Sequence, residues 1–160
     1  MVDPKQKSKA QSSGNWGKRR PRLLLKNPTF YLDESLDCRE VKQVLDDASI
    51  KYKVYSQHFS RSEDDEAILK LAGQRGWLML TGDSKNRFRD AERRAVLFYK
   101  VRLFIFSGNM GGIPLARLVI SLKNKIFQFC REHEPPFIAT ITTGGKILLR
   151  MDKRGNVHQN

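Results

Sequence analysis

Short apolar runs alternate with amphipathic stretches from Phe30 onward, and this alternation constrains the fold more than any other feature of the sequence. The apolar runs predict short strands, and the stretches between them repeat apolar residues every three or four positions, as amphipathic helices do. This order predicts an α/β fold with right-handed crossovers, a mostly parallel central sheet and helices on both faces. The expected strands are residues 30–32, 52–55, 77–81, 103–106, 137–142 and 146–150, and the expected helices are residues 36–49, 62–74, 91–99 and 114–133.

Glycine and proline mark the boundaries of several expected elements. Gly76 should stop the second helix, and Pro114 is well placed at the start of the fourth. Gly144 and Gly145 lie between the last two strands, so we expect the chain to close with a C-terminal hairpin. The loop at residues 107–112 lacks the Gly-x-x-x-x-Gly-Lys spacing of a phosphate loop and is expected to be a simple connection.

The basic residues are concentrated at the N-terminus. Residues 1–28 carry eight Lys or Arg side chains and one acid, so they contribute +7 to a formal charge of +13. This segment has almost no apolar residue before Leu23 and cannot bury enough surface to fold by itself. We expect a flexible basic arm at residues 1–28, a single domain at residues 29–151 and a polar tail at residues 152–160. The arm could solubilise the protein, tether RNA or act as a Lys-Arg-Arg-Pro-Arg targeting signal.

Several classes of protein are excluded by composition. The longest apolar runs, at residues 77–80 and 103–106, fall far short of the roughly 20 residues that cross a bilayer. Residues 1–16 lack the apolar core of a secretory signal, so we expect a cytoplasmic protein with no membrane partner. Cys38 and Cys130 lie in apolar-periodic stretches without a Cys-x-x-Cys pair, which predicts reduced, buried thiols.

Two acids follow predicted strands, Asp33 after Leu32 and Asp83 after a Thr-Gly pair. The carboxyl ends of parallel strands share one edge of a sheet, so both carboxylates should converge there, and Asp65 should lie at the same edge at the start of a helix. Carboxylates about 4–5 Å apart repel one another by several kcal/mol per pair, which a proton or a divalent cation relieves. Oxygen ligands suit Mg²⁺ or Mn²⁺, and such ions can activate water for phosphodiester hydrolysis. The spacing therefore indicates a metal-dependent nuclease or phosphatase.

Each of these acids also has a purely structural explanation. Asp65 follows Ser62 at the spacing of a helix capping box. Asp33 could cap a helix that begins near Leu36, and Asp83 could be an ordinary loop acid. These explanations stay open for the individual residues.

Three blocks of the sequence carry strand-Asp, Asp-x-x-Ile-Leu and Leu-Thr-x-Asp patterns: Phe30 to Leu36, Asp65 to Ala72 and Gly76 to Asp83. In this order they resemble the PIN domain, and more closely the PIN-like branch that includes VapC-type toxins. The resemblance extends over residues 27–150, through residues 87–92, 104–106 and 135–139. It implies a Rossmann-like PIN fold and an Mg²⁺- or Mn²⁺-dependent endoribonuclease.

The resemblance also implies roles for individual residues. Asp33, Asp65 and Asp83 would hold the metal, which would lower the pKa of a bound water that attacks the scissile phosphorus. A fourth acid usually follows the equivalent of Asp83, but Asn86 occupies the near position, so Glu92 is the expected fourth catalytic acid. The same resemblance implies products with 5′-phosphate and 3′-hydroxyl ends, a homodimer, and inhibition by a cognate antitoxin of a toxin–antitoxin pair.

Basic side chains flank the acids, and we expect them to hold backbone phosphates of the RNA substrate, which gives affinity without sequence preference. A solvated helix face is the alternative, because Asp90 and Glu92 lie among them. The alternative function is a catalytically silent PIN-like module that binds RNA or a protein. The basic residues are Lys85, Arg87, Arg89, Arg93 and Arg94.

Overall fold

The computed structural model of the protein describes residues 28–54, 56, 65–82, 90–108 and 110–159. Within them, a six-stranded sheet has the order β2-β1-β3-β4-β5-β6, in which β1 to β5 are parallel and β6 is antiparallel. The predicted mostly parallel sheet and the C-terminal hairpin are confirmed. The strands are β1 (Phe30–Leu32), β2 (Tyr52–Val54), β3 (Leu78–Thr81), β4 (Arg102–Phe106), β5 (Phe137–Ile141) and β6 (Ile147–Met151).

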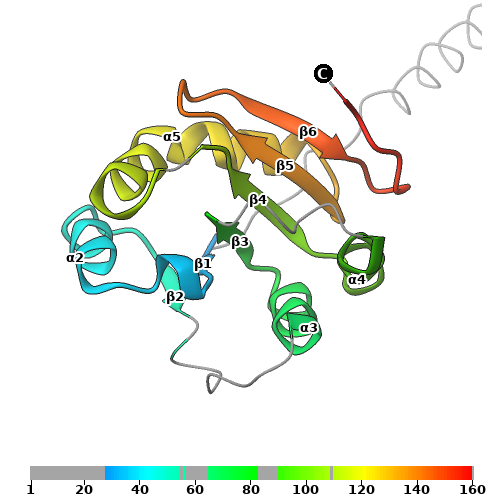
Figure 1. Cartoon of the computed structure of the whole chain (residues 1–160), viewed down its shortest axis with the longest axis horizontal. Coiled ribbons are helices and arrows are strands. Elements are labelled where there is room, and N and C mark those ends of the chain that lie inside the picture. Colours follow the sequence, from blue (N-terminus) through cyan, green and yellow to red (C-terminus); the bar gives the residue numbers. More distant parts are fainter. Residues whose placement is uncertain (1–27, 55, 57–64, 83–89, 109, 160) are drawn as a thin grey trace, which may run out of the picture.

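Helices cover both faces of the sheet, as the sequence predicts. Figure 1 shows α2 and α5 side by side on one face and α3 and α4 on the other. The chain therefore folds as a three-layer α/β structure with the sheet in the middle. The helices are α2 (Arg39–Asp47), α3 (Asp65–Arg75), α4 (Asp90–Tyr99) and α5 (Gly112–Glu132), and a short 3₁₀ helix, η2 (Glu34–Leu36), precedes α2.

The first helix begins later than its apolar pattern suggests. The expected helix at residues 36–49 is α2, which starts only at Arg39. The Asp33 carboxylate accepts a hydrogen bond from the Ser35 backbone N–H at 2.6 Å, and this contact closes the 3₁₀ turn of η2 instead of an α-helical turn. The helix ends at Asp47 because Ser49 adopts a left-handed φ of 56°.

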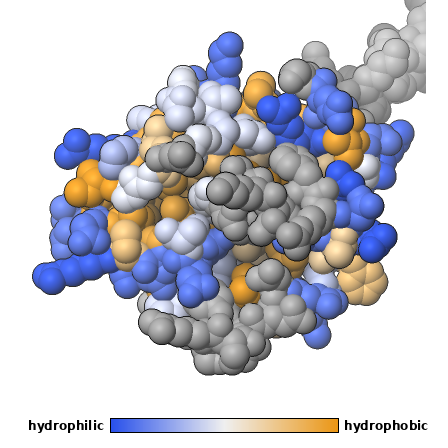
Figure 2. Space-filling model, viewed as in Figure 1, coloured by the Kyte–Doolittle hydropathy of each residue, from blue (hydrophilic) through white to orange (hydrophobic). Residues whose placement is uncertain are grey.

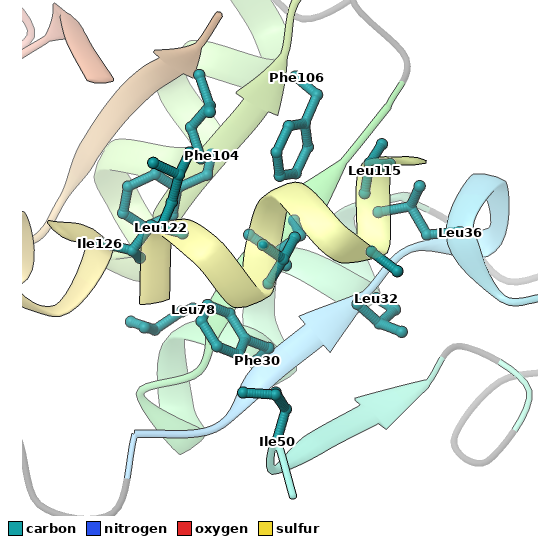
Figure 3. Packing of buried hydrophobic residues seen from close by; sticks show 14 of the residues in the cluster. Phe30, Leu32, Leu36, Ile50, Leu78, Phe104, Phe106, Leu115, Leu122 and Ile126 are labelled. Atoms are coloured by element: carbon teal, nitrogen blue, oxygen red, sulfur yellow. The ribbon is translucent and has the colours of Figure 1, made fainter. Parts of the chain in front are cut away.

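The core lies on both faces of the sheet, because successive strand residues point to opposite sides. Phe30 and Leu32 of β1 join a cluster beneath α2 and α5, whereas Tyr31 joins a second cluster beneath α3 and α4. Figure 3 shows α5 laid across the first cluster, with Phe104 and Leu78 pointing toward it from the strands. Figure 2 shows hydrophobic residues reaching the surface where α2 and α5 meet. Burial on both faces explains why the strands read as continuous apolar runs.

Residues 152–159, for which the sequence suggests a polar tail, turn back onto the sheet. The Asp152 carboxylate accepts from the backbone N–H groups of Arg154 at 2.9 Å and of Asn156 at 3.0 Å. Val157 then forms an antiparallel bridge with Met151, the last residue of β6. The end of the described chain is therefore held against the edge strand of the sheet.

The two cysteines differ in their surroundings. Cys130 is buried in α5, and this burial raises the pKa of its thiol to about 12. Cys38 is only half-buried at the residue before α2, so the expectation of burial holds for Cys130 alone. Both are free thiols. Over the described ranges, no helix combines the length and apolar character that a bilayer span requires.

Candidate functional site

The carboxyl ends of β1 and β3, the second and third strands from the β2 border, lie side by side in the sheet. Leu32 lies opposite Leu80 in the register, and the Asp33 N–H donates to the Leu80 carbonyl at 3.2 Å. The chain goes from β1 outward to β2 on one side and then returns to β3 on the other, so the strand order reverses at this pair. Open α/β sheets bind ligands outside the carboxyl ends of their strands at such a point. We call this side of the sheet the carboxyl edge.

The Asp33 carboxylate is held by hydrogen bonds to both of its oxygens. Oδ2 accepts from the Thr81 hydroxyl at 2.6 Å, and Oδ1 accepts from the Ser35 N–H at 2.6 Å. Thr81 is fully buried at the end of β3, whereas Asp33 is half-buried. An ionised carboxylate carries negative charge on oxygens that each have two lone pairs, which is the kind of group that hard cations bind. Asp33 therefore caps η2 and has the chemistry of a cation ligand.

A second set of contacts fixes the chain where it leaves β3. The Gly82 N–H donates to the Ser35 hydroxyl at 3.3 Å, which ties this residue to η2. A side-chain methyl at Gly82 would meet Leu36 and Leu115 at 3.5 and 3.9 Å. Figure 3 shows Leu36 and Leu115 close together near the end of β1. These two apolar side chains pack beside Gly82, where the chain leaves β3.

Topology brings other predicted acids toward the same edge. Asp65 is the first residue of α3, which runs from the end of β2 back to the start of β3, so its backbone lies at the carboxyl edge. Glu92 is half-buried in the first turn of α4. Like α3, this helix leads into the start of the next parallel strand, here β4, so its first turn also lies toward the carboxyl edge. Asp83 follows Gly82 and lies outside the described residues, as does the side chain of Asp65. The predicted meeting of three carboxylates stays a prediction.

The predicted RNA-binding residues fall largely outside the described chain. This applies to Lys85, Arg87 and Arg89. Arg93 forms an ion pair with Asp90 one turn earlier in α4, so its charge is partly engaged within the helix. Arg94 is exposed on α4.

The structure adds one acid that the sequence analysis did not single out. Asp37 accepts from the Ser56 N–H at 3.0 Å and pairs with the Lys42 ammonium at 3.1 Å. Its side chain is only 8% exposed. Burial raises the pKa of the Asp37 carboxyl, but the hydrogen bonds of Ser56 and Lys42 and the Lys42 charge outweigh this and hold the pKa below its ordinary 3.8. Asp37 thus ties the start of α2 to the chain that leaves β2.

The lowered pKa of Asp37 predicts a pH-dependent contribution to stability. A carboxylate whose pKa is lowered by folding contributes fully to the free energy of unfolding above pH 3.8, and this contribution is lost as the pH falls through the lowered pKa of the folded state. We expect Asp37→Asn to lower the free energy of unfolding by about 1–2 kcal/mol at neutral pH. The difference between wild type and Asp37→Asn should become smaller in acid. Urea titrations at several pH values measure this. Glu40→Gln, at an exposed position of α2, is the matched control, and a gap for Asp37→Asn that stays constant with pH would contradict the assignment.

Within the part of the chain that the structure describes, no three His, Cys, Asp or Glu side chains group closely enough to hold a metal ion. The Asp33 carboxylate suits a hard cation, because it is anionic and binds through oxygen. His133 and His158 lie elsewhere, near the C-terminal ends of α5 and of the described chain. A metal at the carboxyl edge would therefore need the carboxylates of Asp65 or Asp83 beside Asp33.

Comparison with known families matches residues 28–108 to the PIN like domain, which is half of the chain and includes β1 to β4. The chain belongs to the PIN-like domain family. The matched range contains Asp33, Asp65, Asp83 and Glu92. No curated protein and no solved structure matches the chain. Since PIN-like domains are generally nucleases, the family agrees with the chemistry that the acids of the carboxyl edge suggest.

Proposed function

We propose that this PIN-like domain is a metal-dependent endoribonuclease whose active site is the carboxyl edge. One observation supports this most directly: the Asp33 carboxylate lies where the strand order reverses and is oriented by Thr81 and Ser35. Partners of this kind orient a metal-binding carboxylate and set its strength as a ligand. The nuclease character of the family supports a phosphodiester substrate.

In this proposal, Asp33, Asp65 and Asp83 hold Mg²⁺ or Mn²⁺, and Glu92 is the fourth acid. When bound, such an ion lowers the pKa of a coordinated water and offsets the negative charge of the phosphate. Thr81 keeps the Asp33 carboxylate in one orientation, and Ser35 fixes the chain at Gly82 immediately before Asp83. The buried side chains of Leu36 and Leu115 keep water away from the apolar side of Gly82.

The proposal extends to the biological setting. Lys85, Arg87, Arg89 and Arg93 would contact phosphates of a cytoplasmic RNA, and Arg93 would have to share its charge with Asp90. The protein would be the toxin of a toxin–antitoxin pair, acting as a homodimer until a small antitoxin inhibits it. An adjacent small reading frame with a DNA-binding pattern would support this setting.

Removal of the metal tests the proposed chemistry. Purified protein is incubated with structured and unstructured RNA in Mg²⁺, Mn²⁺ or EDTA, and the products are separated on gels. We expect cleavage with at least one cation, none with EDTA, and recovery when the cation is restored in excess.

Cleavage that continues unchanged in EDTA would overturn the metal-carboxylate mechanism. RNA binding without cleavage in either cation would instead favour the catalytically silent module. One observation favours that alternative: the resemblance leads us to expect the fourth acid shortly after Asp83, but Asn86 occupies that position.

A further inference from the structure

Ser35 joins the ends of the two strands that meet at the carboxyl edge. Its backbone N–H donates to the Asp33 carboxylate, just after β1, at 2.6 Å. Its hydroxyl oxygen accepts the N–H of Gly82, just after β3, at 3.3 Å. Both contacts are made by one residue, so the Ser35 hydroxyl lies beside the Asp33 carboxylate and belongs to the carboxyl edge.

The Ser35 hydroxyl still has a hydrogen to donate. A serine hydroxyl has one O–H donor and two acceptor lone pairs, and the Gly82 N–H uses only one of the lone pairs. Among the residues that the structure describes, no acceptor takes this hydrogen, and Ser35 is exposed. An N–H bond to the oxygen also polarises the O–H bond and makes its hydrogen a better donor. Ser35 can therefore donate to a bound molecule without losing an internal contact.

Thr81 differs from Ser35 in this respect. Its hydroxyl donates to the Asp33 carboxylate at 2.6 Å, and the residue is fully buried at the end of β3. The hydrogen of Thr81 is thus used to orient the carboxylate. Of these two hydroxyl groups beside Asp33, the one on Ser35 is open to a ligand at the carboxyl edge.

A site that carries acids needs neutral donors if it is to hold a phosphodiester. Carboxylates repel phosphate oxygens, whereas a hydroxyl can donate to them without bringing a charge of its own. The proposed substrate places its phosphate at the Asp33 carboxylate. The Ser35 hydroxyl is the neutral donor next to that carboxylate.

We propose that Ser35 is a further catalytic residue, whose hydroxyl donates a hydrogen bond to a non-bridging oxygen of the scissile phosphate. This role rests on the proposed function and adds a residue to it. In the hydrolysis, the water oxygen bonds to phosphorus and the bond from phosphorus to the 3′ oxygen breaks. One water proton passes to the leaving 3′ oxygen and the other to solvent, so the Ser35 hydroxyl keeps its own proton.

The hydroxyl acts mainly on the transition state. Negative charge is then spread over the non-bridging oxygens of the phosphate. A donor that is already held in place stabilises this charge with little reorganisation. The Gly82 N–H and the closed turn of η2 hold Ser35 in this way. Loss of the hydroxyl should therefore lower kcat and leave KM nearly unchanged.

Ser35→Ala tests this role, with Ser121→Ala as the matched control. Ser121 is an exposed serine in the middle of α5, and its hydroxyl donates to the Leu118 carbonyl at 2.9 Å. We expect Ser35→Ala to lower kcat for RNA cleavage by about 100-fold, whereas Ser121→Ala stays near wild type. Ser35→Thr keeps a hydroxyl and should recover most of the loss. A folded Ser35→Thr that is as slow as Ser35→Ala would overturn the role of the hydroxyl.

The requirement for metal separates this role from a structural one. Ser35→Ala also removes the acceptor of the Gly82 N–H, so a merely structural role would displace the chain after β3. That displacement would raise the Mg²⁺ or Mn²⁺ concentration needed for half-maximal cleavage. We expect this concentration to stay unchanged, because the backbone N–H of residue 35 still donates to Asp33. A large rise would overturn the proposed role, and urea unfolding without metal checks that the variant is folded.

Sulfur substitution at the cleaved phosphate locates the contact. An RNA with a single phosphorothioate at the linkage that the wild-type protein cleaves is prepared as two separate stereoisomers. Sulfur is a weak hydrogen-bond acceptor. One isomer should therefore slow the wild type at least about 5-fold more than it slows Ser35→Ala, because the two changes remove the same contact. Equal slowing of the two proteins by both isomers would overturn the contact.

The same measurements distinguish the role of Ser35 from the proposed function. Equal metal-dependent cleavage by the wild type and Ser35→Ala would overturn the role of Ser35 and leave the nuclease standing. Absence of cleavage by the wild type in either cation would overturn the nuclease, and the role of Ser35 with it.

Discussion

Replacing Asp33 by Asn is expected to reduce kcat/KM for metal-dependent RNA cleavage by at least about 100-fold. Loss of a residue that only orients a metal ligand lowers activity by up to about 100-fold, so loss of a ligand itself should lower it at least as much. The amide has the size of the carboxylate, and its oxygen can still accept the Ser35 N–H, so η2 should stay closed. What it lacks is the negative charge that a hard divalent cation requires. Single-turnover cleavage at several Mg²⁺ and Mn²⁺ concentrations measures the loss.

Two further variants show whether the charge at Asp33 is the cause. Glu34→Gln removes a charge from the exposed neighbouring residue of η2 and should leave cleavage near the wild-type rate. Thr81→Val removes the hydroxyl that donates to Asp33, and an intermediate loss of about 10-fold is expected. Wild-type cleavage by Asp33→Asn would place the active site elsewhere.

Replacing Gly73 by Ala is expected to cost at least about 2 kcal/mol of folding free energy. Gly73 lies in α3 where the helix passes the end of α4, and a Cβ there would lie 1.9 Å from the Tyr99 carbonyl oxygen. Because the obstacle is backbone, no side-chain rotation relieves the clash. The helices would have to separate, which loosens the core around Tyr31 and Ile68. Urea unfolding at neutral pH measures the change.

Gly144→Ala is the matched control for this prediction. Gly144 lies in the turn between β5 and β6, where the nearest atom to an added Cβ is 3.9 Å away. We expect its free energy of unfolding to stay within about 0.5 kcal/mol of wild type. Similar values for the two variants would show that α3 and α4 do not depend on this close approach.

The sequence predicts the order and type of the elements well, for a clear physical reason. Strands buried on both faces need apolar residues at every position, and the run at residues 77–81 shows this for β3. Helices buried on one face repeat apolar residues at helical spacing, as in α5. Both patterns are local, so they can be recognised without knowing which strands pair.

Contacts that depend on strand pairing could not be predicted. The Thr81 hydroxyl meets Asp33 across 48 residues of sequence, and the Ser56 N–H meets Asp37 across 19. Their existence depends on β1 lying between β2 and β3 in one particular register. The late start of α2 has the same origin, since the Asp33 carboxylate that closes η2 is also held by Thr81 from the next strand. The strand-end position of Asp33 was predictable, but its partners were not.

The closure of β6 by its own chain bears on how copies of this protein meet. An open strand edge offers unpaired N–H and C=O groups to another chain and promotes aggregation. Here the His158 N–H donates to the Arg150 carbonyl at 2.7 Å, so part of that edge is already occupied. At the far side of the sheet, β2 is only three residues long and carries the exposed Lys53. Both borders of the sheet therefore disfavour the addition of a strand from another copy. Fibre-like assembly should be suppressed even at high protein concentration.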